Sequence, residues 1–65
     1  MKLDVFKIQL IMAEAEMNLS DVAKKTENNR QNISLVLRRG TCTTKMAGKI
    51  AHALGVAVRE IVVPE

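Results

Sequence analysis

Apolar residues recur at helical spacing along most of the chain, in segments separated by short polar breaks. The first segment follows Asp4, a residue type that caps helix starts, and runs to about Glu16. Its main apolar stripe comprises Val5, Ile8, Ile11, Met12 and Ala15, and a second stripe of Phe6, Leu10 and Ala13 lies roughly opposite. Two apolar faces predict a helix at the centre of a small bundle, with self-association through the second face as the alternative.

Two short helices joined by a tight turn are expected next. Asn18 followed by Asp21 forms a variant of the capping box and predicts a helix ending near Thr26. Its inward residues are Leu19, Val22, Ala23 and Thr26. Asn29 then caps a helix from Arg30 to Arg38, whose inward residues are Ile33, Val36 and Leu37. The sequence therefore predicts a helix-turn-helix unit over residues 18–38.

A fourth helix is expected from a cap at Thr43 or Thr44 to Leu54, where Gly55 would end it. Its inward residues are Met46, Ala47, Ile50, Ala51 and Leu54. Gly48 costs about 1 kcal/mol relative to alanine inside a helix; we expect it to reflect close packing of another backbone, with a simply suboptimal site as the alternative. Residues 56–63 are apolar and rich in β-branched side chains, so a helix over Val58–Val62 and a strand both remain open until Pro64.

The outer face of the third helix carries the chemistry of major-groove recognition. Gln31, Ser34, Leu35 and Arg38 lie opposite the inward residues, and Arg30 and Asn32 flank them. Asparagine and glutamine pair bidentately with adenine, arginine pairs with guanine, and leucine offers an apolar contact to the thymine methyl group. These residues predict a DNA-reading face, with an ordinary solvated face as the alternative.

Charge is concentrated in the middle of the chain. Between Lys24 and Lys49 there are seven basic residues and a single acidic one, Glu27, and both flanking segments are net acidic. This distribution predicts a face that binds a polyanion, with a solvated basic surface as the alternative. Phe6 is the only aromatic residue, which argues against base stacking on single strands.

Chain length and residue content limit which classes of protein and which kinds of site the sequence allows. Sixty-five residues make one domain, which buries only about 60% of the surface that its unfolded chain exposes. A lone Cys42 and a lone His52 predict neither a disulfide nor a metal site, and no catalytic or phosphate-loop motif is present. Signal-peptide and membrane-span patterns are absent from the sequence. We therefore expect a cytoplasmic protein that is not an enzyme and uses no cofactor, membrane or small-molecule ligand.

Three stretches together resemble the lambdoid-repressor-like, or Cro/repressor (XRE-type), helix-turn-helix DNA-binding domains. They are L-S-D-V-A-K-K-T (Leu19 to Thr26), R-Q-N-I-S (Arg30 to Ser34) and A-G-K-I-A-H-A-L-G-V (Ala47 to Val56). The resemblance extends over the whole chain and implies an all-α, five-helix bundle. It also implies a third helix in the major groove, a second helix across the DNA backbone, and two copies on a roughly palindromic operator.

Three positions depart from that family pattern. Glu27-Asn28 stands where the turn usually carries glycine and an apolar residue, which predicts a reshaped turn. Gly40 comes one position late, with Arg39 in the usual place of the glycine, so the third helix is expected to end differently. Ala57 replaces the usual polar cap of the last helix and weakens the expectation of that helix.

The sequence thus predicts a sequence-specific, double-stranded DNA-binding transcriptional regulator, a repressor or Cro-like protein of a phage or mobile element. The expected base-contacting residues are Arg30, Gln31, Asn32, Ser34 and Leu35. The expected backbone-contacting residues are Asn18, Ser20, Lys24, Asn29, Arg38, Arg39, Thr41 and Lys45. A homodimer on DNA is expected through Val58, Ile61, Val62 and Val63, with the Phe6 and Leu10 stripe as the alternative surface. The alternative functions are a protein-interaction module and an antitoxin built on the same bundle.

Overall fold

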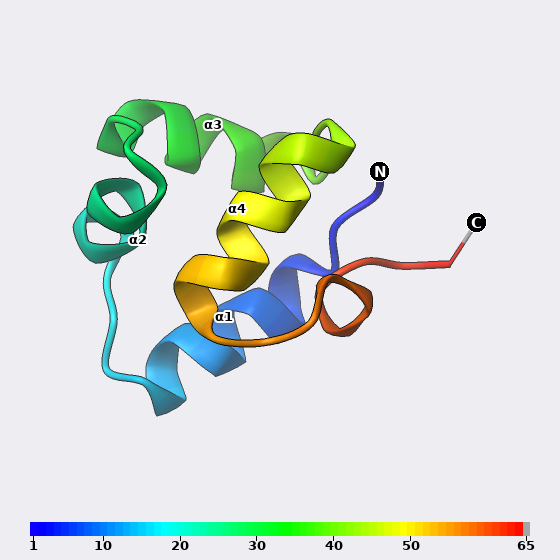
Figure 1. Ribbon diagram of the computed structural model, residues 1–65, viewed down its shortest axis with the longest axis horizontal. Helices are drawn as coiled ribbons and strands as arrows, with labels where there is room; N and C mark the ends of the chain where they lie inside the picture. Colours follow the sequence, from blue (N-terminus) through cyan, green and yellow to red (C-terminus); the bar gives the residue numbers. More distant parts are fainter. Residues whose placement is uncertain (65) are drawn as a thin grey trace.

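Helices make up most of the computed structural model, which describes residues 1–64 and has no β-strand in that range (Figure 1). The helices are α1 (Val5–Glu14), α2 (Leu19–Thr26), α3 (Arg30–Arg39), α4 (Thr44–Leu54) and a 3-10 turn, η1 (Val58–Glu60). In Figure 1, α4 runs between α1 on one side and α3 on the other, and α2 lies at one end of α3. None of these helices is long and apolar enough to cross a bilayer.

Each of the four α-helices begins at a polar side chain that accepts a backbone N–H of the first turn. Asp4 accepts from the Lys7 N–H at 3.0 Å, and Thr43 accepts from the Met46 N–H at 3.2 Å. The Asn18 and Asp21 side chains each accept the backbone N–H of the other residue at 2.9 Å. The caps predicted from sequence are confirmed, and Thr43 rather than Thr44 caps α4.

Residues with a left-handed backbone conformation follow the helices. Gly40 and Gly55 follow α3 and α4 with φ of 73° and 75°, a conformation that glycine adopts without steric cost. Glu16 and Glu27 adopt similar values, 54° and 59°, without being glycine. Helix α1 consequently stops at Glu14, two residues before the expected end, because the chain turns at Glu16.

The core lies where α1, α2, α3 and α4 converge. Its largest fully buried side chains are Ile8, Val22, Ile33, Ile50 and Ile61, which come from every part of the chain. Most of them were expected from helical periodicity, and Val36, Leu37, Leu19 and Met46 pack against the core while half-exposed. Leu3, only 4% exposed, also belongs to this core although it precedes the first helix.

Three segments meet beside the helices, and we call them the terminal seam: residues 1–3, 40–42 and 61–63. Leu3 forms an antiparallel bridge with Val62, and Lys2 forms one with Thr41. The backbone hydrogen bonds that hold the seam are Leu3 N to Gly40 O (2.7 Å), Cys42 N to Met1 O (2.9 Å), Asp4 N to Ile61 O (2.8 Å) and Val63 N to Lys2 O (2.9 Å). The first three residues therefore lie between the α3–α4 loop and the segment after η1.

The expected fifth helix is wrong in length. The structure has a single 3-10 turn at Val58–Glu60, after which Val62 forms an antiparallel bridge with Leu3. Ala57 offers no side-chain acceptor to the turn, and Glu60 supplies only the reciprocal contact to the Ala57 N–H at 3.1 Å. Pairing of Val62 with Leu3 stabilises extended backbone there in place of a longer helix.

Two further expectations need correction. Ile61 has no exposed surface, because it fills the core of the monomer, so it is not available as a dimer contact. A Cβ added at Gly48 would meet no atom of the described residues within 4 Å, outside its own helix backbone and immediate neighbours. Among residues 1–64, no backbone packs closely against Gly48, and that glycine is simply suboptimal for helix α4.

Candidate nucleic-acid interface

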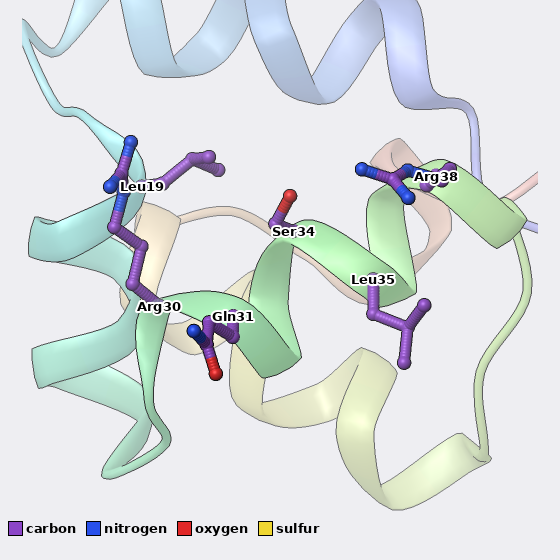
Figure 2. Close-up of a pocket in the computed structure, with 6 residues that line it drawn as sticks. All are labelled: Leu19, Arg30, Gln31, Ser34, Leu35 and Arg38. Atoms are coloured by element: carbon purple, nitrogen blue, oxygen red, sulfur yellow. The ribbon is translucent and has the colours of Figure 1, made fainter.

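The outward side of α3 borders a shallow groove of about 370 Å³ (Figure 2). Its lining residues are Leu19, Arg30, Gln31, Ser34, Leu35 and Arg38. Five of these six come from α3; helical spacing predicted four of the five on its outer face and Arg30 at the flank of that face. The structure therefore brings four of the five expected base-contacting residues into one open surface.

The side chains of this surface form two rows, as Figure 2 shows. Arg30, Ser34 and Arg38 extend from the side of α3 that faces α1, and Gln31 and Leu35 extend from the other side. Leu35 leaves 39% of its surface exposed on this face. The combination offers two guanidinium groups, one amide, one hydroxyl and one apolar contact, a set suited to base edges.

A second groove, of about 330 Å³, continues the first one between α3 and α1. The two share Leu19, Ser34 and Arg38, and the second adds Gln9 from α1 together with apolar residues of α1 and α3. Leu19 was expected only as a core residue, and Gln9 was not predicted at all. Helical spacing predicts the helix to which each of these two residues belongs. It does not predict that residues of α1, α2 and α3 lie beside one another at the same groove.

Asn32 does not share the outward direction of its neighbours. Its Nδ2 donates to Oδ1 of Asn28 at 2.9 Å, and its side chain is half-buried against the turn between α2 and α3. Its backbone N–H donates to the Asn29 cap at 2.6 Å. The amide expected to read a base thus points back toward the protein, because position 32 lies at the edge of the outer face.

The expected backbone-contacting residues occupy the ends of helices. Lys24 lies in the last turn of α2, Arg38 and Arg39 lie in the last turn of α3, and Lys45 lies in the first turn of α4. All four are exposed, as are the other basic residues between positions 24 and 49. Such a distribution places exposed positive charge around α3, which favours contact with phosphates.

The polar residues of that expected set have additional structural roles. Asn18 and Asn29 use their side-chain oxygens as helix caps, which leaves their Nδ2 groups available to donate. Thr41 lies in the terminal seam opposite Lys2, and Ser20 is exposed in the first turn of α2. Free backbone N–H groups at the starts of α2 and α3 add donors of the kind that bind phosphate.

The turn between α2 and α3 keeps a regular geometry despite its unusual residues. Glu27 is left-handed, the Asn28 N–H donates to the Ala23 carbonyl at 2.8 Å, and the Glu27 N–H donates to the Lys24 carbonyl at 3.3 Å. This is the Schellman pattern, in which the residue after the left-handed position usually makes an apolar contact. Asn28 occupies that position and is half-buried.

The remaining candidates for chemistry lie apart from this face. Burial raises the pKa of the Cys42 thiol, and the nearby N-terminal ammonium group partly opposes that effect, so the thiol is not activated as a nucleophile. His52 is exposed on α4. Residues 1–64 contain no group of three or more His, Cys, Asp or Glu side chains that is arranged to hold a metal ion.

Comparison with protein families matches residues 7–65 to the model of the Cro/C1-type HTH DNA-binding domain. Comparisons with curated proteins and with solved structures found no match. The family match covers all four α-helices except the first two residues of α1, and it includes the entire outer face of α3. The chain therefore belongs to the Cro/C1-type family of helix-turn-helix DNA-binding domains.

Proposed function

We propose that this chain is a sequence-specific transcriptional regulator that binds double-stranded DNA with α3 in the major groove and represses by occluding the promoter. The observation that carries the proposal is the two-row surface of α3, where Arg30, Gln31, Ser34 and Leu35 project together with exposed basic residues around them. Repression and an origin in a phage or mobile element rest on analogy with the family.

Gln31 is the residue that we expect to contribute most to base choice. It is exposed on the first turn of α3 and lies almost opposite the fully buried Ile33, so the packing of Ile33 directs Gln31 outward. An amide donates and accepts at once, which matches the N6 and N7 edge of adenine. Arg30 is longer and reaches either a guanine or a phosphate, and Leu35 suits a thymine methyl group.

The test is selection of bound fragments from a genomic library, followed by gel shifts with competitor DNA. We expect one short motif to be retained when nonspecific competitor is added. Gln31→Ala should remove the preference at one base pair per half-site, a loss of about 1–3 kcal/mol of discrimination, and should leave thermal stability unchanged. Retention of no DNA, with capture of an acidic protein in parallel pull-downs, would replace this proposal with a protein-interaction function.

Lys45→Ala supplies the matched control for Gln31→Ala. Lys45 is exposed at the start of α4 and is proposed to contact a phosphate, so its loss should weaken binding to all sequences alike. The slope of log affinity against log salt should fall by up to about 1, with base preferences retained. An unchanged slope would place the phosphate contacts on other residues.

We further propose that two copies bind one operator and pair through α1. Of the surfaces expected for a dimer, Ile61 is buried and Val62 is half-buried against Leu3, but Phe6 and Leu10 are 70% and 47% exposed. Antiparallel pairing of two α1 helices around Leu10 would bring Lys7 of one copy near Glu14 of the other, so the surface is complementary to itself in charge as well as apolar.

Sedimentation and binding stoichiometry test the pairing. Phe6→Ser should lower the fraction of dimer and the DNA affinity. At protein concentrations low enough for the monomer to predominate, it should leave the melting temperature unchanged, because the side chain is 70% exposed in the monomer. Val62→Ser is the comparison variant on the other surface and should leave the dimer fraction unchanged. One chain per operator would contradict the pairing. Loss of the dimer in the Val62 variant alone would show that the dimer contact lies in the segment after η1.

A further inference from the structure

The side chains of Asn28 and Asn32 form a contact that connects the helix-turn-helix turn to the first turn of α3. Asn32 Nδ2 donates to Asn28 Oδ1 at 2.9 Å, and both residues are half-buried. In the same turn, Asn32 also donates its backbone N–H to the cap of α3. Asn32 is therefore fixed at both its main chain and its side chain.

Asn28 extends this contact to the rest of the bundle. Its Nδ2 donates to the Thr26 carbonyl at 3.0 Å and lies 4.0 Å from the sulfur of Met46 on α4. Its backbone N–H donates to the Ala23 carbonyl of α2 at 2.8 Å. One side chain thus contacts the end of α2, the start of α3 and a core-packed residue of α4.

The oxygen and the amino group of the Asn28 side chain both have partners. Asn28 Oδ1 accepts from Asn32, and the Asn28 amino group has both a carbonyl and a sulfur within reach. Because both amides are half-buried, water replaces a lost partner only in part, which makes separation of the pair unfavourable. An apolar residue in the turn would contact Met46 but would offer no acceptor to Asn32.

The orientation of α3 matters because base recognition tolerates little displacement. Hydrogen bonds to base edges require donor and acceptor to lie within about 2.7–3.2 Å of each other. A rotation of α3 by about 20° would move a side-chain tip 5–6 Å from the helix axis by about 2 Å, enough to break such a bond. Gln31 directly precedes Asn32, and Leu35 lies three residues after Asn32. If loss of the Asn32 contact lets α3 rotate about its axis, the side chains of Gln31 and Leu35 are both displaced.

We infer that Asn28 and Asn32 form an amide latch that sets the rotation of α3 on the bundle, and that Asn32 governs base selectivity by positioning Gln31, Leu35 and Arg30 without contacting DNA. The inference deepens the proposed function and rests on it for its selectivity readout. Asn32 is thereby removed from the base-contacting set and becomes a positioning residue.

The test combines Asn32→Ala, Asn28→Val and the double variant with base-by-base selection and binding measurements. Each single variant should lower affinity for the preferred operator about three- to tenfold and relax preferences at several adjacent base pairs. The double variant should be no worse than the more affected single variant, because both changes break the same contact. Gln31→Ala is the control and should relax one base pair per half-site.

Each alternative role of the two residues gives a different pattern. If Asn32 contacts a base, Asn32→Ala loses preference at one position and Asn28→Val leaves selectivity unchanged. If the pair only adds stability, melting temperature falls and the preferences stay as in the parent chain. Additive losses in the double variant would also overturn the latch.

A measurement on the free protein separates the latch from the proposed function. In ¹⁵N-resolved NMR spectra, the side-chain amide protons of Asn32 should exchange with water more slowly than those of Gln31, which is exposed. Asn28→Val should abolish the slow exchange of Asn32 and shift backbone resonances along α3. Fast exchange in the parent chain would overturn the latch, and absence of DNA binding with slow exchange retained would overturn only the function.

Discussion

The helix-turn-helix unit and the terminal seam are held by different kinds of contact. Within residues 18–39 the hydrogen bonds outside the regular helix ladders join residues two to five positions apart, and many involve asparagine side chains. In the seam, backbone groups pair across the chain, as Leu3 does with Gly40 and Asp4 does with Ile61. The surface proposed to read DNA is thus built on local contacts, and the seam closes the bundle with contacts between distant segments.

The two regions differ in what fixes their geometry, although each contributes a fully buried isoleucine to the core, Ile33 in α3 and Ile61 in the seam. Side-chain caps and amide contacts are directional, so they fix how α2 and α3 lie relative to each other. Backbone pairing in the seam depends little on side-chain identity, apart from Leu3 and Ile61, which insert into the core. Substitutions in the two regions should therefore give losses of different size and kind.

The largest effect is expected at the seam, from Ile61→Ala. Removing a fully buried isoleucine side chain should lower the free energy of unfolding by about 2–5 kcal/mol, a large share of the total for a chain of this size. The milder Ile61→Val should cost about 0.5–1.5 kcal/mol and retain the fold. Urea unfolding followed by circular dichroism measures the free energy of unfolding of both variants. An unchanged urea midpoint for Ile61→Ala would contradict the burial of Ile61 in the core.

A smaller effect is expected at the helix caps. Asn29→Ala removes the acceptor of the Asn32 N–H and should lower the free energy of unfolding by about 1 kcal/mol.

Ala57→Ser makes the opposite change at η1, where it would complete a capping box with Glu60, and should raise the free energy of unfolding by up to about 1 kcal/mol. Equal and negligible effects at both sites would show that caps contribute nothing in either region.

The smallest effect is expected within α4, and its sign is the informative part. Gly48→Ala should raise the free energy of unfolding by about 0.5–1 kcal/mol, because the added methyl group meets no neighbour and alanine favours helix. Gly55→Ala is the matched control and should lower stability, because Gly55 has a φ of 75°. Thermal unfolding of both variants checks the signs, and destabilisation by Gly48→Ala would indicate a close contact at that position.

Local signals in the sequence predicted most of the helix-turn-helix unit. Asn18, Asn29 and Thr43 mark helix starts because their side chains accept backbone donors a few residues away, and Ile33 marks the inward side of α3 through its spacing. The outward placement of Gln31 and Leu35 follows from the same spacing. Asn32 lies at the edge of that face, and only the contact with Asn28 determines its direction.

The terminal seam was not predicted, for a physical reason. Leu3 pairs with residues about 40 and 60 positions later, and a three-residue segment has no periodicity that distinguishes it from a flexible end. The β-branched residues after Val58 favoured neither a helix nor a strand until a partner was available. For the same reason the sequence predicts Ile61 at the dimer surface, whereas the structure buries it in the core.

The terminal seam also has a consequence for the order of events during folding. Contacts between residues 1–3 and 61–63 close a loop of nearly the whole chain, so they form at the greatest cost in chain entropy. We expect the local contacts of α2 and α3 to be formed already in the folding transition state, because short loops close at a smaller cost in chain entropy. We therefore expect Leu3→Ala to accelerate unfolding while leaving the refolding rate nearly constant, so that the lifetime of the native state depends on the seam.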